Sequence, residues 1–155
     1  MKEIKGHKVT LFEGDMRRRE EANRQYLMKL ETPHLLRSYL HEAGRYSGRG
    51  ADGNALGGWE DLSCQLRGHF LGHWLSAAAL NFEATGDTEL KAKTENILDE
   101  LALCQKDNGG QWVCAIPEKY LYWIGQGKGV WAPQYNIHKL FMGLIDVYKF
   151  MELEK

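Results

Sequence analysis

The sequence predicts an all-α fold, because apolar residues recur at helical spacing through most of the chain. No alternating strand pattern longer than about four residues interrupts them. Clusters of glycine, a poor helix former, separate the periodic segments. With 155 residues, the chain has the usual size of one domain. We therefore expect helix–loop–helix pairs in a single folding unit, residues 1–155.

Residues 15–31 and 34–43 form the first two predicted helices. Each carries a stripe of apolar side chains spaced three to four positions apart. Thr32 is expected to cap the second helix, with Pro33 at its first position. Six glycines follow within residues 44–58, so no helix is expected in that stretch.

Residues 62–84 and 88–106 form the next predicted pair. Asp61 is a plausible cap for the first of them, which is apolar almost all round and is expected to be an inner helix. The fourth helix is expected to turn five apolar side chains inward: Leu90, Ile97, Leu98, Leu101 and Leu103. A loop-rich stretch then extends to about residue 133.

The last predicted helix spans residues 135–152, with Asn136 as its N-cap. Its expected inward stripe is Ile137, Leu140 or Phe141, Leu144, Tyr148 and Met151. Two connections in the chain run to about fifteen and twenty-five residues, whereas compact bundles use about 2–8. Loops of that length often cover a functional site. Since the chain stops as this helix ends, we expect it to be part of a larger helical domain.

Composition excludes several classes of function. The formal net charge of −1 argues against nucleic-acid binding by phosphate neutralisation and against a polybasic membrane anchor. No apolar run approaches the roughly 18 residues of a membrane span, and the start lacks the apolar region of a signal peptide. The three cysteines show no paired CxxC spacing, which is typical of a reducing compartment. We therefore expect a cytoplasmic protein with neither a nucleic-acid nor a membrane partner.

The most unusual segment is residues 67–79, where Gly68 and Gly72 lie one turn apart inside a predicted helix. Such glycines open a strip where a backbone or a ligand can approach closely. His69 and His73 lie beside that strip, and three interpretations stay open for them. They are core histidines bonded to backbone carbonyls, a zinc pair, or groups that bind ligand hydroxyls. The zinc interpretation lacks the glutamate of an HExxH motif, because Phe70 takes that position.

A second candidate group surrounds the start of the last helix. His138 is expected in the first turn, where the helix dipole disfavours its protonation. Trp131 and Tyr135 flank it, and this arrangement suits a sugar that stacks on ring faces while its hydroxyls reach a neutral imidazole. Trp59 and Glu60 add an aromatic ring and a carboxylate at another helix entrance.

Several segments of the chain resemble glycoside hydrolase family 127, the β-L-arabinofuranosidases, and they occur in the same order as in that family. The most specific is Arg-Gly-His-Phe-Leu-Gly-His-Trp-Leu-Ser-Ala-Ala-Ala at residues 67–79. The others include Arg-Gln-Tyr-Leu-Met-Lys-Leu at 24–30, Gly-Trp-Glu at 58–60, Ala-Thr-Gly-Asp at 84–87, Val-Trp-Ala-Pro-Gln-Tyr-Asn-Ile-His-Lys at 130–139 and Gly-Leu-Ile-Asp-Val-Tyr at 143–148. The resemblance covers about residues 9–150.

This resemblance implies an (α/α)6 barrel of about twelve helices. The chain supplies the first five or so of them, and we therefore expect a partial barrel with long glycine-rich loops. Members cleave β-L-arabinofuranosyl or related linkages with retention, using a zinc-bound cysteine nucleophile and a glutamate acid/base. Both residues lie in a later part of the family's barrel. None of the three cysteines here matches them (Cys64, Cys104 and Cys114).

What the resemblance carries over is sugar recognition. It implies substrate contacts from His69, His73 and His138, with Trp59, Glu60 and Trp131 as wall residues. No catalytic residue, metal ligand or cofactor is assigned to the chain, although the resemblance implies zinc in the complete enzyme. Gln134 and Asn136 depart from the tyrosine and threonine that the family often has, which leaves the glycone preference open.

The leading hypothesis is therefore the N-terminal part of a retaining glycosidase that binds carbohydrate and is inactive alone. The alternative from another class is a non-catalytic helical binding or interaction module. The glycosidase hypothesis also predicts an exposed apolar face through which the chain self-associates.

Overall fold

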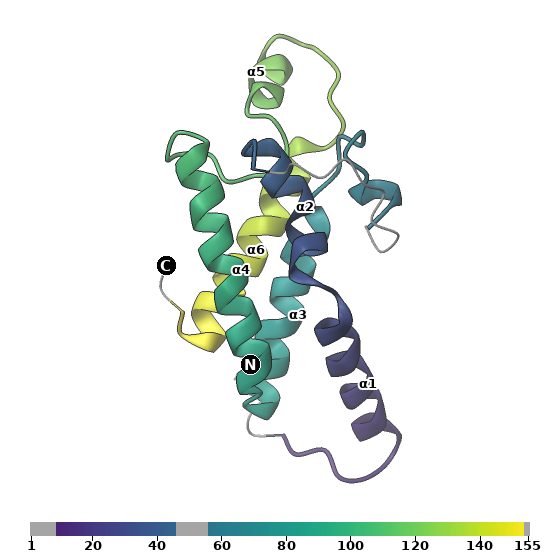
Figure 1. Ribbon diagram of the computed structural model, residues 1–155. Helices are drawn as coiled ribbons and strands as arrows, with labels where there is room; N and C mark the ends of the chain where they lie inside the picture. The colour runs from purple at the N-terminus through teal and green to yellow at the C-terminus, as the bar shows by residue number, and fades with distance from the viewer. Residues whose placement is uncertain (1–8, 46–55, 154–155) are drawn as a thin grey trace, which may run out of the picture.

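The computed structural model describes residues 9–45 and 56–153, and these form helices and loops without a strand. The elements are α1 (Asp15–Lys29), α2 (Thr32–Glu42), the short 3₁₀ helix η2 (Gly58–Glu60), α3 (His69–Thr85), α4 (Thr88–Asp107), α5 (Lys119–Gly125) and α6 (Pro133–Met151). The predicted all-α class is confirmed (Figure 1). In the part of the chain so described, every helix is too short or too polar to cross a membrane.

The helices lie in two layers, with α4 and the α1–α2 pair in one and α3 and α6 in the other (Figure 1). Helices α3 and α6 share the most extensive helix–helix interface among the described elements. They run in the same direction, because Gly72 of α3 faces Lys139 and, one turn later, Ser76 donates a hydrogen bond of 2.5 Å to Asp146. The prediction that α3 is an inner helix is confirmed by its buried residues, which include Trp74 and Leu75.

Two glycines allow α3 and α6 to approach this closely. A Cβ atom on Gly72 would lie 1.9 Å from the Lys139 carbonyl oxygen, and one on Gly143 would lie 2.5 Å from the Gly72 carbonyl oxygen. Neither position has room for a side chain. At Gly72 the predicted strip is therefore filled by the backbone of α6, not by a ligand.

The α1–α2 pair runs parallel to α4 in the other layer. Arg24 of α1 pairs with Glu89 at 2.6 Å, Lys93 donates to the Met28 carbonyl at 2.9 Å, and Arg45 after α2 pairs with Asp107 at 2.7 Å. Residue numbers therefore rise in the same direction along the α1–α2 pair and along α4, which shows that they are parallel. Consecutive elements α3 and α4, joined by Gly86 and Asp87, run in opposite directions. Alternating antiparallel helices in two layers are the arrangement of an (α/α) barrel.

The first seven residues of the predicted third helix, 62–68, are not helical. Residues 61–68 form turns, and Asp61 accepts bonds from the backbone nitrogen (2.8 Å) and hydroxyl (2.6 Å) of Ser63 instead of capping α3. Gly68 adopts φ 91°, a left-handed conformation that separates these turns from α3. The predicted third helix thus began too early, at residue 62, because its apolar pattern continues into the turns.

The start of α6 was also predicted wrongly. The helix begins at Pro133, and Ala132 holds the cap position. Asn136 is buried within the first turn, where its side-chain amide donates to the Gln65 carbonyl at 3.2 Å. The cap is therefore not Asn136, and His138 lies in the second turn instead of the first.

Four smaller predictions were wrong as well. Helix α2 already includes Thr32, so its cap position belongs to Glu31. Leu103 points outward from α4, and Tyr148 points outward from α6. Of the two alternatives Leu140 and Phe141, Leu140 is the buried one, and the buried stripe of α6 also contains Gly143, Val147 and Met151. The stretch predicted as loop contains α5.

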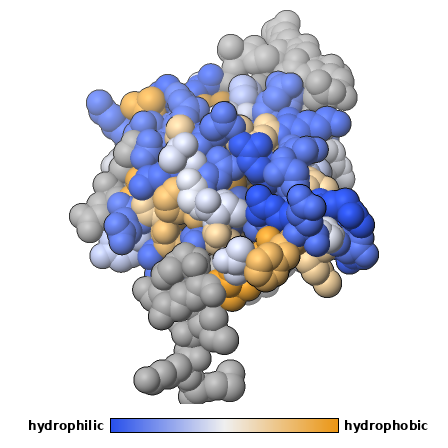
Figure 2. All heavy atoms as spheres, turned by 90° about the horizontal axis from the view of Figure 1, so that it is seen from below, coloured by the Kyte–Doolittle hydropathy of each residue, from blue (hydrophilic) through white to orange (hydrophobic). Residues whose placement is uncertain are grey.

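The two ends of the molecule differ in chemistry. Viewed from the end where α1 begins and α3 finishes, the surface is mostly hydrophilic, with small separate apolar areas (Figure 2). Ion pairs such as Arg24 with Glu89 join the outer helices near this end. The opposite end carries η2, α5 and the first turns of α3 and α6 (Figure 1).

Candidate functional site

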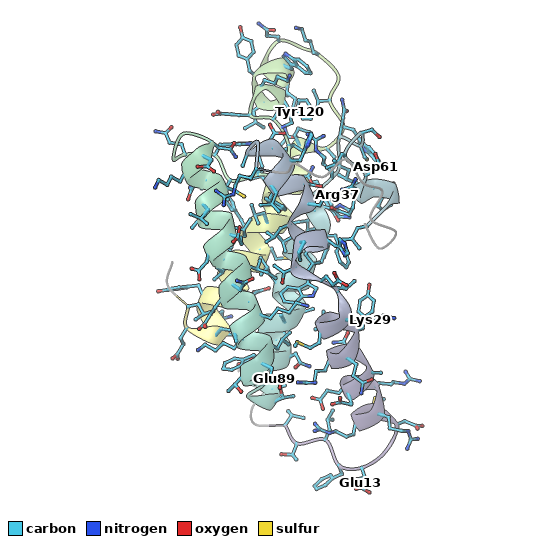
Figure 3. All side chains as sticks on the ribbon, in the orientation of Figure 1. Glu13, Lys29, Arg37, Asp61, Glu89 and Tyr120 are labelled. Atoms are coloured by element: carbon cyan, nitrogen blue, oxygen red, sulfur yellow. The ribbon has the colours of Figure 1, made fainter. Side chains whose placement is uncertain are left out.

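Five aromatic or imidazole side chains meet at the end where α3 and α6 begin; we call them the ring cluster. They are Trp59, His69, His73, Trp131 and Tyr135. The His69 ring centroid lies 6.1 Å from that of Trp59, 6.0 Å from that of His73 and 6.0 Å from that of Tyr135. The two indoles lie 6.2 Å apart, edge to face. In Figure 3 the labelled Asp61 and Tyr120 mark this end, and Glu13 and Glu89 mark the other.

Gly68 connects η2 to the start of α3. Its backbone nitrogen donates to Glu60 at 2.7 Å, and its carbonyl accepts from the buried Tyr39 hydroxyl at 2.8 Å. A Cβ atom here would lie 2.1 Å from the Cβ of Ala115. With a left-handed φ and no space for a side chain, the position requires glycine. The fold thereby places His69, the next residue, at the first position of α3.

His69 is buried at the base of the ring cluster. Its Nδ1 lies 3.1 Å from the Leu66 carbonyl oxygen and 2.7 Å from Glu60 Oε1. The interpretation of a core histidine bonded to a backbone carbonyl therefore holds for one nitrogen of the ring. Nε2 has no hydrogen-bond partner among the described residues.

His73 lies one turn further along α3, and its Nε2 is 3.4 Å from the Tyr135 hydroxyl of α6. Burial lowers the pKa of His73, and the positive charge of Lys139 and the nearby His69 lower it further. The ring therefore stays neutral to a lower pH than a free histidine does. A neutral imidazole can both donate and accept a hydrogen bond.

Gln65 fixes the start of α6 against the turns before α3. Its side-chain oxygen accepts from the Trp131 backbone nitrogen at 2.8 Å, and its carbonyl accepts from Asn136. Gln65 was not among the predicted site residues, because no pattern distinguishes one surface glutamine from another. Tyr135 was predicted only as a neighbour of His138, although its position at the start of the predicted helix 135–152 was a signal that could have found it.

The structure brings together five of the six predicted site residues: Trp59, Glu60, His69, His73 and Trp131. The exception is His138, whose side chain is exposed and makes no hydrogen bond or ring contact with the residues described. Tyr135 takes the place in the ring cluster that His138 was expected to hold. Glu60 differs from the other four because its carboxylate bonds the backbone at the start of α3.

The arrangement favours binding of a polar, hydroxyl-rich ligand over bond cleavage. The side chains of Trp59 (61% exposed) and Trp131 (49% exposed) are open to solvent, and the imidazole and phenol groups of the cluster lie next to them. Glu60 is the carboxylate closest to His69 and already accepts hydrogen bonds from two backbone nitrogens. Such a carboxylate is poorly placed to transfer protons to a substrate.

The comparison with protein families found one match. Residues 8–155 match the β-L-arabinofuranosidase GH127 catalytic domain, which is nearly the whole chain. The chain belongs to this family. Searches of curated proteins and of solved structures found no match. The family is one of glycoside hydrolases, and the resemblance seen in the sequence is confirmed.

The zinc that this family implies does not fit the described residues. No three side chains of the types His, Cys, Asp and Glu come close enough together there to hold a metal ion. Cys104 and Cys114 are buried, and the thiol of Cys64 accepts a hydrogen bond from the Leu66 backbone. We therefore derive no step of the reaction through zinc.

Proposed function

We propose that this GH127 chain forms one wall of the sugar pocket of a retaining β-L-arabinofuranosidase. The ring cluster carries this proposal, because indole faces stack on a sugar ring while neutral imidazoles exchange hydrogen bonds with its hydroxyls. His69 and His73 would contact the hydroxyls, and Trp59 and Trp131 the ring. His138 is a more peripheral candidate on the same helix as Tyr135.

The chain alone is proposed to be catalytically silent. A retaining glycosidase needs a nucleophile and an acid/base about 5–5.5 Å apart. The carboxylate next to the ring cluster is that of Glu60, and it already accepts hydrogen bonds from two backbone nitrogens. We expect no release of L-arabinose from a β-L-arabinofuranosyl substrate by the purified 155-residue chain, measured by chromatography. Release above that of a heat-denatured sample would contradict this part of the proposal.

Binding is the positive test. We expect methyl β-L-arabinofuranoside to bind in the millimolar range, about −4 kcal/mol, since part of a pocket makes few contacts. His73→Ala and Trp131→Ala should each weaken binding about tenfold, the equivalent of one hydrogen bond or stacking contact. Tyr148→Ala, an exposed aromatic elsewhere on α6, is the matched control and should bind like the wild type. Calorimetric titration measures all four affinities. Equal affinities throughout would contradict the proposal.

The glycosidase hypothesis also predicts an exposed apolar face, and one helix carries such a face. Helix α6 exposes a face made of Phe141 (51%), Ile145 (61%) and Tyr148 (59%). Apolar side chains at this spacing form a continuous stripe, a feature typical of interaction surfaces. We propose that the isolated chain self-associates through this stripe.

Self-association is tested by sedimentation velocity at increasing concentration. The wild-type chain should shift to faster species, and Ile145→Glu should remain a monomer because it places a charge in the stripe. Phe12→Ser is the control, since Phe12 is 86% exposed but lies outside α6. A wild-type chain that stays monomeric at every concentration would contradict self-association and favour the alternative, a self-contained helical binding or interaction module.

A further inference from the structure

Glu60 holds the start of α3 with both oxygens of its carboxylate. Oε2 accepts from the Gly68 backbone nitrogen at 2.7 Å, and Oε1 accepts from the Phe70 backbone nitrogen at 3.0 Å. Oε1 also lies 2.7 Å from Nδ1 of His69, the residue between them. The side chains of Glu60 and His69 are only 12% and 11% exposed. The carboxylate therefore faces the backbone at the start of α3 and is largely shielded from solvent.

This geometry determines which nitrogen of His69 carries the proton. The two groups nearest Nδ1 are the Leu66 carbonyl and the Glu60 carboxylate, and both are hydrogen-bond acceptors. An unprotonated Nδ1 would place its lone pair against two oxygen atoms. A neutral His69 thus carries its proton on Nδ1, and its Nε2 is an acceptor.

We propose that Glu60 is a positioning residue that keeps His69 in the Nδ1–H tautomer and so presents Nε2 as an acceptor for a ligand hydroxyl. That Nε2 meets a sugar rests on the proposed function; the tautomer and the role of Glu60 do not. The family resemblance implies that Glu60 is a residue of the pocket wall, in contact with substrate. The geometry assigns it instead to the far side of His69, acting on a ligand through that ring.

The other titratable groups around His69 do not compete for Nδ1. His73 on α3 and Tyr135 on α6 approach the ring from the cluster side, at centroid distances of 6.0 Å. Lys139 lies over the Tyr135 ring, 5.0 Å from its centroid. On the opposite side, Tyr39 donates its hydroxyl to Gly68, and Arg67 pairs with Glu42. Glu60 is therefore the charged group in direct contact with the His69 ring.

The first test reads the tautomer of the wild-type chain without any sugar. Long-range ¹H–¹⁵N correlation spectra distinguish a protonated from an unprotonated ring nitrogen. We expect the neutral form of His69 to carry its proton on Nδ1, with Nε2 unprotonated. A predominant Nε2–H tautomer would overturn the proposal whatever the chain binds, and this holds even if a Glu60 variant fails to fold.

The second test separates Glu60 from the Leu66 carbonyl, which also faces Nδ1. Glu60→Gln keeps the shape of the side chain and removes its charge, so the Nε2–H tautomer should become populated. Affinity for methyl β-L-arabinofuranoside should fall about tenfold, by loss of one hydrogen bond. Asp61→Asn is the matched control, because Asp61 is the adjacent carboxylate and bonds Ser63. Asp61→Asn should change neither the tautomer of His69 nor the affinity for the sugar.

The outcomes distinguish the two proposals. An unchanged tautomer in Glu60→Gln would overturn the role of Glu60, since the Leu66 carbonyl would then suffice. An equal change in Asp61→Asn would overturn it too, because the effect would not depend on contact with His69. If the tautomer shifts only in Glu60→Gln but the wild-type chain binds no sugar, the positioning role is supported and the proposed function fails.

Discussion

Burial separates the three cysteines of this chain. Cys104 and Cys114 are buried, whereas Cys64 is partly exposed. Loss of hydration raises the pKa of Cys114 to about 12 and raises that of Cys104 from its ordinary 9.0. A thiol attacks only as its thiolate. The two buried cysteines are therefore poor nucleophiles at neutral pH.

Alkylation of the folded chain tests this difference. With iodoacetamide at pH 8, Cys64 should be modified first, while Cys104 and Cys114 should react only after unfolding in urea. Peptide mass analysis at successive times gives the order. Modification of Cys114 as fast as that of Cys64 in the folded chain would show that its thiol is accessible and ionised.

The histidines show how far single residues can be predicted. The sequence placed His69 and His73 one turn apart on an inner helix, and both lie in the ring cluster. It placed His138 beside Trp131 and Tyr135, but the role of neighbour to His73 belongs to Tyr135. The error is one of position along the helix, because His138 lies three residues, about 4.5 Å, beyond Tyr135 on α6 and therefore further from the end that carries the ring cluster. Helical spacing is readable from sequence, whereas the turn of the helix that reaches a site depends on where the helix begins.

Among the elements, the crossing of α3 and α6 depends on two glycines. Alanine at Gly72 or Gly143 would push the helices apart, because its Cβ would meet the backbone of the other helix. Each substitution should lower the free energy of unfolding by about 2 kcal/mol or more, as expected for overpacking. Urea denaturation measures the loss.

Gly125→Ala is the control for this prediction. Gly125 is the last residue of α5, and nothing lies within 4 Å of the position of its Cβ. Stability should stay unchanged or rise by up to about 1 kcal/mol, the gain in helix propensity. A Gly72→Ala chain as stable as Gly125→Ala would mean that α3 and α6 do not cross at this point.

The helix interiors were predictable, and several helix ends were not. The interior of α4 follows its apolar spacing, and its real cap, Asp87, accepts from the backbone nitrogens of Glu89 and Leu90 at 3.0 Å. The start of α3 is set by Glu60, eight residues before Gly68 in the chain. A capping group so distant leaves no local pattern. Asp61 matched the local pattern and instead stabilises a turn.

In the molecule as a whole, the candidate site arises where two parallel inner helices begin. The sequence predicted the helical class and the residue types of the site. It did not predict that Tyr135 would reach His73, which is 62 positions away. That contact depends on α3 and α6 running in the same direction at close range, which the glycines allow. The family match and this geometry together support a sugar site at the end that carries the ring cluster.

A cavity away from the ring cluster offers a rival location. It lies between α1 and α2, has a volume of about 290 Å³ and is lined in part by Tyr26, Lys29 and His34. A sugar could hydrogen-bond to these polar groups as well. The position of a bound sugar therefore decides between the two sites.

The most direct measurement is a crystal structure of the chain with methyl β-L-arabinofuranoside. We expect the furanose ring to lie against Trp59 and Trp131, with one of its hydroxyls donating a hydrogen bond to Nε2 of His69. A sugar bound between α1 and α2, with the ring cluster empty, would contradict it.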